Sequence, residues 1–302
     1  MAQFRGIWIV TPTLNQLEWL KLCVSSVRDQ SCGFDIRVHH HVQDGGSNDG
    51  TVKFLKEHNE AMLKEGRVSK SSYTFSYVSE RDNGMYDAIN RGWRRSSNEF
   101  DILGHLNSDE QYLEGALRQV ISFFREHAKT DIVFGDVVVL DGSGEYICSR
   151  RVLNPSFWHT RVFSLNTFTA ATFVRRSKLL DGNWFFDTDW RAVGDRIWML
   201  ERLKEGASME PMGVYSSVFV DTGKNLALSE RARREHSLVA EMTPIWMRRV
   251  ALAFLAWHRV RRLLAGHYTP RPFTFSRFVQ GNAESRVVSY VAKPTGIWRG
   301  RM

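Results

Sequence analysis

The sequence contains little cysteine, and its amino terminus lacks a hydrophobic run long enough for a secretion signal. The three cysteines, Cys23, Cys32 and Cys148, have neither the paired spacing of a disulfide framework nor the spacing of metal ligands. This pattern favours free thiols in a reducing compartment over a disulfide-rich secreted protein. The apolar stretch that ends at Val10 spans five residues, too few for a signal peptide. We therefore expect a cytoplasmic location.

An excess of basic residues is also absent from most of the chain. The formal net charge is +8, yet residues 244–302 alone hold eleven Lys and Arg and one acid, Glu284, which leaves 30 basic and 32 acidic residues elsewhere. A body without basic bias is not expected to bind nucleic acid. We expect the basic tail to meet an anionic surface instead.

What the chain does have is a regular alternation of apolar and amphipathic segments. Strands are predicted at 6–11, 34–42, 73–78 and 100–106, and helices from about residue 16 onward and at 51–65, 86–95 and 113–127. A strand pair is predicted at 131–140 and 145–152, across the turn at 141–144. Repeated strand–helix units predict an α/β fold with a Rossmann-like, mostly parallel sheet flanked by helices on both faces.

Polar, acid-bearing loops follow four of these strands, at residues 11–15, 43–51, 79–84 and 107–110. In sheets of this kind the carboxyl ends of the strands lie at one edge, and ligands bind there. The four loops together therefore predict a ligand-binding crevice rather than four unrelated turns.

The loop at 43–51 is rich in glycine but is not a phosphate cradle, because Asp44 and Asp49 would repel a phosphate. Gly45 and Gly46 permit positive φ and the close approach of a flat ligand. Acid in this place indicates hydrogen bonding to a base or a ribose. An ordinary strand–helix turn explains the same residues equally well.

The loop at 107–110 follows a strand directly, so Asp109 and one neighbour are expected to point into the crevice together. A carboxylate beside an amide oxygen suits Mg²⁺ or Mn²⁺, which complete their coordination with water and phosphate oxygens. The alternative is a simple turn, capped by Asn107, with Asp109 in solvent.

Taken together and in this order, the motifs resemble family 2 glycosyltransferases with the GT-A nucleotide-diphospho-sugar fold, most similar to bacterial enzymes that build surface or extracellular polysaccharides. The matching segments are 10–15, 43–51, 79–92, 106–109 and Gly194-Asp195 at the start of a helix. The resemblance implies a GT-A catalytic domain at residues 1–225 and a basic, partly helical extension at 226–302.

The resemblance also implies a role for each matching residue. The nucleotide-sugar pocket would be formed by Thr11, Pro12, Thr13, Asp44, Gly45, Asp82, Gly84, Asp87, Asn90, Asn107 and Ser108. Asp44 would accept a hydrogen bond from the base, and Asp109 would hold the Mg²⁺ or Mn²⁺ that bridges the diphosphate. Asn107 stands where the family's Asp-x-Asp motif has its first Asp, but it still supplies an oxygen.

Asp195 is the predicted general base. In an inverting transfer a carboxylate must take the proton of the acceptor hydroxyl while the nucleotide leaves from the opposite face. The alternative is that Asp195 only stabilises the positive end of a helix. Asp187 and Asp189 are nearby rivals for the role of base.

One departure from the family pattern leaves the acceptor open. Thr169 and Ala170 stand where many relatives carry His-Gln, and neither replaces an imidazole. Arg175, Arg176 or His159 are candidates to substitute for it, although a solvated surface charge is the simpler interpretation of each.

The tail is expected to form a helix from Pro244 to about Ala265. Its arginines and His258 would gather opposite Trp246 and Trp257, and its uninterrupted apolar stretch of eight residues is too short to span a bilayer. Such a helix fits the surface of an anionic membrane, at the inner face of the plasma membrane. It fits equally well a helix packed on the catalytic domain with its arginines in water.

The sequence thus predicts an inverting glycosyltransferase that moves a sugar from a nucleotide-diphospho-sugar to a glycan or lipid-linked acceptor in polysaccharide biosynthesis. Two alternatives remain open. One is a catalytically silent scaffold that binds sugar nucleotides, and the other is a nucleotidyltransferase, which would be expected to carry a basic triphosphate loop after its first strand.

Overall fold

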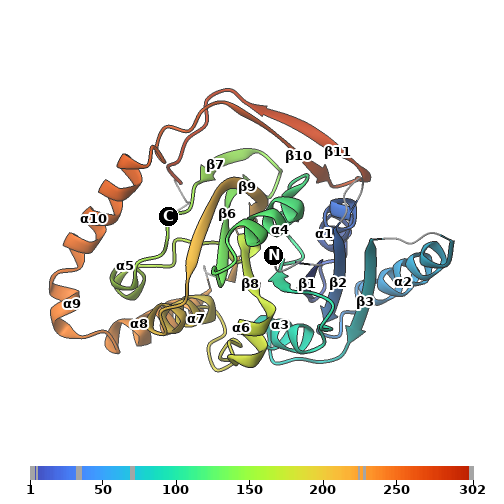
Figure 1. The fold of residues 1–302 in the computed structure, drawn as a ribbon, viewed down its shortest axis with the longest axis horizontal. Coiled ribbons are helices and arrows are strands. Elements are labelled where there is room, and N and C mark those ends of the chain that lie inside the picture. The colour runs from blue at the N-terminus through green and yellow to red at the C-terminus, as the bar shows by residue number, and fades with distance from the viewer. Residues whose placement is uncertain are drawn as a thin grey trace.

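Four parallel strands carry the polar loops. The computed structural model describes residues 4, 6–31, 36–68, 72–223, 225–226 and 229–298. Strands β1 (Gly6–Thr13), β2 (Arg37–Asp44), β3 (Tyr73–Ser79) and β4 (Ile102–His105) pair in parallel in the order β3-β2-β1-β4 (Figure 1). These are the four strands predicted from the sequence, although residues 34 and 35 of the predicted second strand lie outside the described residues. Their common direction places all four carboxyl ends at one edge of the sheet.

The other half of the sheet is mixed. It contains β5 (Gln111–Tyr112), β6 (Ile132–Asp141), β7 (Tyr146–Arg150), β8 (Thr172–Arg175) and β9 (Met209–Asp221). The predicted pair β6–β7 is confirmed, and β9 runs parallel to β6. Strands β5, β8 and β9 were not predicted from the sequence. Because β8 lies antiparallel to both β4 and β6, it introduces a reversal that the strand–helix alternation did not reveal.

Helices cover both faces of the sheet. Successive residues of β1 point to opposite sides, so its apolar side chains contribute to a hydrophobic core on each face. On one face lie α1 (Leu17–Arg28), α2 (Thr51–Val68) and α4 (Ala116–Glu126), and on the other lie α3 (Met85–Arg94), α6 (Arg176–Asp181) and α7 (Gly194–Lys204). Ile7 and Ile9 belong to the core of the first face. Trp8 and Val10 belong to the core of the second. The expected α/β sheet flanked by helices is therefore confirmed.

The carboxyl-terminal segment follows one side of the molecule and then crosses to the opposite side (Figure 1). It contains α8 (Glu230–Glu241), α9 (Ile245–Arg249), α10 (Ala251–Leu264), β10 (Phe273–Val279) and β11 (Asn282–Val291). The single helix expected from Pro244 to about Ala265 is wrong in one respect, since the backbone at Val250 (φ −100°, ψ 12°) separates α9 from α10. The hairpin β10–β11 was not predicted.

The orientation of α10 also differs from the expectation. His258 and Arg262 point inward, where the ring of His258 stacks on His159 at 4.0 Å and Arg262 donates a hydrogen bond to the carbonyl of Gly296 at 3.2 Å. The apolar side of the helices faces outward, and Trp257 is 60% exposed. Helix α10 packs on α5 (Phe157–Val162), which agrees with the interpretation of a helix packed on the catalytic domain. That interpretation placed the arginines in water, whereas here Arg262 is buried and apolar side chains such as Trp257 are in solvent. Of the helices described, none is both long enough and apolar enough to cross a bilayer.

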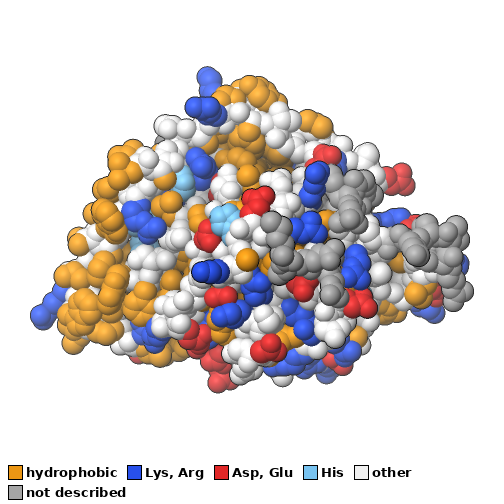
Figure 2. Space-filling model, viewed as in Figure 1, with side chains coloured by type: hydrophobic (Ala, Val, Ile, Leu, Met, Phe, Trp, Pro, Cys, Tyr) orange, Lys and Arg blue, Asp and Glu red, His pale blue; other side chains and the backbone are white. Residues whose placement is uncertain are grey.

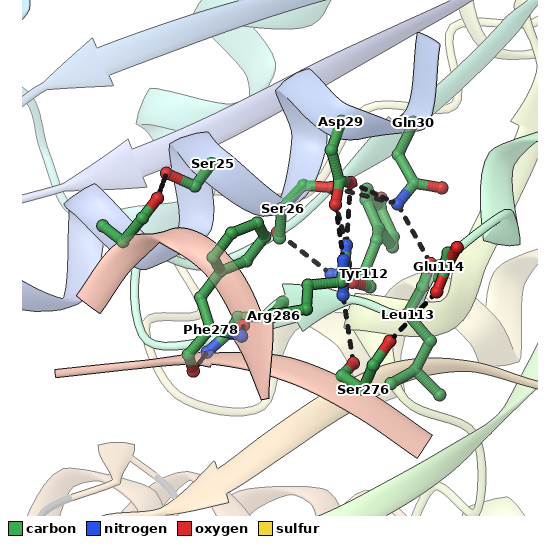
Figure 3. A network of polar contacts seen from close by, with 12 residues as sticks. Ser25, Ser26, Asp29, Gln30, Tyr112, Leu113, Glu114, Ser276, Phe278 and Arg286 are labelled. Carbon is green, nitrogen blue, oxygen red and sulfur yellow. Dashed lines mark hydrogen bonds and ion pairs between the residues drawn. The ribbon is translucent and has the colours of Figure 1, made fainter. Parts of the chain in front are cut away.

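Arg286, on β11, joins the hairpin to the segment that follows α1 (Figure 3). Its guanidinium pairs with both carboxylate oxygens of Asp29, in the short 3₁₀ helix Asp29–Ser31 that follows α1. It also donates to the carbonyl of Tyr112 on β5 and to that of Ser276 on β10, both at 3.0 Å. One largely buried guanidinium thus connects the 3₁₀ helix after α1, the sheet and both strands of the hairpin.

Candidate active site

A cleft of about 930 Å³ opens at the carboxyl ends of the parallel strands. From the predicted set it is lined by Pro12, Thr13, Asp82, Gly84, Asn107, Ser108, Asp109 and Asp195. Residues from the loops after β1, β3 and β4, together with Asp49 from the loop after β2, therefore meet the start of α7 in one cavity, as the loop pattern indicated. Thr11, Asp44, Gly45, Asp87 and Asn90 lie behind this lining rather than in it.

Asp44 organises the loop between β2 and α2. Its carboxylate is fully buried and accepts hydrogen bonds from the backbone N–H groups of Gly46 and Ser47, both at 3.1 Å. The hydroxyls of Ser47 and Ser79 donate to it at 2.5 and 2.6 Å. The structure thus gives Asp44 a set of partners within its own loop and β3, and its contact with a base stays a prediction.

Three other predicted residues hold the wall of the cleft together from behind. The amide of Asn90 donates to the carbonyl of Phe186 at 2.8 Å and accepts from its N–H at 2.9 Å. Asp87 accepts from Arg91 at 2.8 Å. Burial alone would raise the pKa of Asp87, but the hydrogen bonds it receives, from a backbone N–H and from Arg91, outweigh burial and lower it. The hydroxyl of Thr11 bonds His40 at 2.9 Å.

Asp82 and Gly84 shape the entrance to α3. One oxygen of Asp82 accepts from the N–H of Gly84 at 2.7 Å, and Gly84 has a φ of +105°, which glycine adopts without strain. Burial raises the pKa of Asp82. This turn places the carboxylate of Asp82 on the cleft side, opposite the loop that contains Gly45.

The segment Asn107–Glu110 presents oxygen atoms that have no protein partner among the described residues. Oδ1 of Asn107 and Oε1 of Glu110 are both buried without a hydrogen bond. Burial raises the pKa of Asp109, and burial together with the charge of Asp109 raises the pKa of Glu110 to about 8. Two crowded carboxylates beside an unpaired amide oxygen fit a hard divalent cation. Within the described ranges no group of three acidic, His or Cys side chains surrounds such a site, so water and phosphate would complete the coordination.

Asp195 lies at the inner end of the cleft, in the first turn of α7. The hydroxyl of Tyr86, on α3, donates to its carboxylate at 3.2 Å, and the N–H of Arg196 donates at 2.8 Å. Burial raises the pKa of Asp195 despite these bonds. Its rivals Asp187 and Asp189 are exposed, and neither lines the cleft.

Thr169, the departure from the expected family pattern, lines the cleft and also a small cavity of about 20 Å³ beside Asp195. None of the suggested substitutes lines the cleft. Arg175 lies over the rings of Phe4 and Phe124, Arg176 bonds Ser96, and His159 stacks on His258. The imidazole of His105 does line the small cavity beside Thr169 and Asp195, but burial lowers its pKa to about 3, so it is a neutral side chain rather than a cationic replacement.

Several lining residues were not predicted as site residues. They include Gln16 and Trp19 at the start of α1, Asp49 in the loop after β2, Tyr86, Glu110, Phe219 on β9, and Thr222, Asn225 and Leu226, which follow β9. Tyr86 lies inside the matching segment 79–92 and Glu110 inside the polar loop 107–110, so the sequence did contain a signal for both. Phe219 and the residues after it are placed by β9, a strand that was not predicted from the sequence, so this wall of the cleft was not predicted either.

Comparison with known proteins settles the family. A model of the family described as glycosyl transferase family 2 matches residues 8–196. The chain belongs to glycosyl transferase family 2. This confirms the resemblance stated from the motifs and, with it, the membership in a family of transferase enzymes.

Curated glycosyltransferases are similar over part of the chain. A PGL/p-HBAD biosynthesis glycosyltransferase of Mycobacterium tuberculosis (strain ATCC 25618 / H37Rv) is 27% identical over 161 residues, which is 51% of this chain and 57% of that protein. An uncharacterized glycosyltransferase of the same strain is 34% identical over 113 residues, 37% of each chain. The chain thus spans little more than half the length of the first relative.

Solved structures extend the likeness to most of the fold. Mannosyltransferase PcManGT from Pyrobaculum calidifontis, in complex with GDP-Man and Mn²⁺, is similar with a TM-score of 0.57 and 16% identity, over 87% of this chain and 79% of that one. S. aureus TarS 1–349 in complex with UDP-GlcNAc is similar with a TM-score of 0.56 and 13% identity, over 87% and 75%. The expected GT-A fold is confirmed.

Proposed function

We propose that the protein is an inverting glycosyltransferase that moves a sugar from a nucleotide-diphospho-sugar to a hydroxyl of a glycan or lipid-linked acceptor in polysaccharide biosynthesis. The observation that carries the proposal is the meeting of Asp195, Asp109 and Asp82 in one cleft at the carboxyl ends of the strands. Family membership and the donor complexes of the structural neighbours support a nucleotide-sugar donor.

Asp195 is the proposed general base. Its carboxylate borders the cleft and is oriented by Tyr86, so an acceptor hydroxyl bound beside it can transfer its proton to the carboxylate as the oxygen attacks the anomeric carbon. Because its pKa is raised, this carboxylate is a stronger base than an exposed carboxylate. It must lose its own proton before it can accept that of the acceptor hydroxyl.

Asn107, Asp109 and Glu110 would hold Mg²⁺ or Mn²⁺ through the oxygens described above. When bound, the ion would stabilise the negative charge on the departing nucleoside diphosphate. The protein contributes the fixed turn, in which the N–H of Asn107 donates to Oε2 of Glu110 at 2.8 Å and leaves Oε1 of Glu110 and Oδ1 of Asn107 unpaired.

Substitution of Asp195 by Asn tests the function directly. We expect Asp195→Asn to abolish the release of UDP or GDP from a panel of UDP- and GDP-sugars, with calorimetric binding of the free nucleoside diphosphate nearly unchanged. Asp187→Asn, on the exposed neighbouring loop, is the control and should keep the wild-type rate. A variant Asp195→Asn that retains most of the rate would exclude the assignment, and metal-dependent binding without turnover by the wild type would favour the silent scaffold.

A lipid-linked acceptor would bring the protein to a membrane, and the outer face of α9 and α10 supports an association with anionic lipid. Hydrophobic side chains gather over these helices (Figure 2). Leu252 and Leu264 are 77% and 80% exposed, with Arg248 and Arg259 exposed beside them. Large apolar side chains next to basic ones are typical of helices that lie at a bilayer surface. This face would place the enzyme at the inner face of the plasma membrane.

Point variants test the membrane association better than truncation, because removal of residues after Thr243 also removes the hairpin that packs on α1. We expect Trp257→Ser with Leu264→Ser to weaken binding to vesicles that contain phosphatidylglycerol. Leu63→Ser, on the exposed side of α2, is the matched control and should bind like the wild type. Equal binding by all three proteins would exclude this face as the docking surface.

A further inference from the structure

The loop that precedes Asp195 is held by a residue from α8, more than forty positions later in the chain. The carboxylate of Glu235 accepts hydrogen bonds from three consecutive backbone N–H groups, those of Arg191 at 2.9 Å, Ala192 at 2.8 Å and Val193 at 3.1 Å. Glu235 is buried, with 7% of its surface exposed. A buried carboxylate with three N–H donors forms strong, directional bonds that fix the backbone it contacts.

These three N–H groups lie at the amino-terminal end of α7, which begins at Gly194 after Val193. The N-cap residue of α7 is Val193, whose side chain makes no capping hydrogen bond. The carboxylate of Glu235 instead supplies the negative charge that stabilises the amino-terminal end of a helix. The donors immediately precede Asp195 along the chain. A shift of this backbone would therefore move the carboxylate of Asp195 with it.

A second contact from α8 lies on the other side of Asp195. His236, next to Glu235, bonds the guanidinium of Arg196 at 3.1 Å, and Arg196 also donates to the carbonyl of Thr160 at 2.8 Å. On the cleft side, Tyr86 fits against Gly194 so closely that a Cβ there would stand 2.7 Å from its ring. Asp195 is thus placed between α3 and α8, with little room for its backbone to shift.

From this geometry we infer that Glu235 is a positioning residue for Asp195, and that α8 is part of the catalytic machinery rather than of a separable extension. The inference rests on the proposed role of Asp195 as general base. Glu235 does not line the cleft and touches neither donor nor acceptor. It acts through the backbone of residues 191–193, by fixing where the base stands relative to the acceptor hydroxyl.

The test compares Glu235→Gln with Glu241→Gln, which makes the same change in charge at the exposed end of the same helix. Gln offers one acceptor oxygen and turns an amide group toward the remaining N–H donors. We expect kcat of Glu235→Gln to fall by about ten- to a hundredfold, because small displacements of a reacting group have effects of this size. KM for the donor should change little, and Glu241→Gln should behave like the wild type.

Two further readouts separate positioning from a general loss of stability. Hydrogen exchange of the 191–193 amides should accelerate in Glu235→Gln at temperatures where the protein is folded. The acidic limb of the kcat–pH profile should move to lower pH, since a loosened turn admits water to Asp195. Glu235→Asp, which keeps the charge but is one methylene shorter, should recover part of the rate.

The inference is wrong if kcat of folded Glu235→Gln equals that of the wild type, or if kcat falls only with the folded fraction while the pH profile stays in place. Failure of the proposed function has a different signature. In that case the wild type releases no nucleoside diphosphate from any donor, whereas the exchange of the three amides still reports whether Glu235 holds the loop.

Discussion

A Cβ atom on Gly45 would stand 2.9 Å from Oδ2 of Asp82, so the loop after β2 and the loop after β3 approach each other as closely as a glycine permits. The other oxygen of Asp82 is held by the N–H of Gly84 at 2.7 Å. Asp82 therefore cannot move away without disturbing the turn that begins α3. Two separate loops of the cleft are coupled at this one contact.

We expect Gly45→Ala to weaken nucleoside diphosphate binding about tenfold, equivalent to about 1.4 kcal/mol, because the added methyl group displaces Asp82 from the cleft wall. Calorimetry with UDP and GDP measures the change. Gly142→Ala is a fitting control, since its Cβ would meet its nearest atom at 3.7 Å and it lies outside the cleft. Unchanged affinity in Gly45→Ala would show that the position of Asp82 does not matter for the nucleotide.

The hydrogen bonds of Asp44 lead to a prediction that distinguishes a loop role from a role in base recognition. Asp44→Ala leaves the N–H groups of Gly46 and Ser47 and the hydroxyl of Ser79 without their acceptor, which should cost about 3 kcal/mol of unfolding free energy. Urea denaturation without nucleotide measures it. If Asp44 served only the base, the unfolding free energy would stay at the wild-type value and only nucleotide affinity would fall.

Asp195 should make stability depend on pH. Because burial raises its pKa, the native protein keeps this proton to a higher pH than the unfolded chain does. Below the ordinary carboxyl pKa, about 3.9, both states are protonated. As pH rises through the native pKa, the native state acquires a buried charge and loses stability relative to the unfolded chain.

We therefore expect the wild type to lose stability relative to Asp195→Asn as pH rises above about 4, by about 1.4 kcal/mol for each tenfold difference in proton affinity between the native and unfolded states. Urea denaturation of both proteins at several pH values measures the difference. A stability difference that stays constant, or changes in the opposite direction, would mean that the surroundings of Asp195 do not raise its pKa.

Arg286 and Asp29 allow a test of the hairpin's attachment. We expect Arg286→Ala to lower the unfolding free energy by about 2 kcal/mol, since it leaves a partly buried carboxylate and two carbonyls without their donor. Arg286→Lys keeps the charge but lacks the planar fork that reaches both oxygens of Asp29, and should recover less than half of the loss. Full recovery by Lys would show that charge alone holds the hairpin.

The parallel half of the fold could be predicted because each strand–helix unit has its own hydrophobic pattern, as in β1 and α1. The strand β9 was missed because Pro211 and Gly213 interrupt its alternation, and its register against β6 shifts near them. The hairpin did leave a signal, since Gly281, with a φ of +82°, separates two strand-like runs.

Within the site, Asp195, Asp109 and Asp82 were predicted because the family motifs keep their order along the chain. The tertiary partners of these residues have no such local signature. Glu235 is one of many charged residues on an amphipathic helix, and only the packing of α8 on residues 191–193 gives it a role. For the same reason the sequence could not show that Asp44 would be enclosed by its own loop.

The attachment of β11 to the first helix also affects how the chain reaches its native state. Arg286 and Asp29 are separated by 257 positions, so α1 and the 3₁₀ helix after it obtain these partners only after the segment that contains β11 has been synthesised. Contacts of such high sequence separation form late and slow the final step of folding. We expect refolding to show an early phase in which the parallel sheet is formed and a slower phase in which the hairpin closes on it.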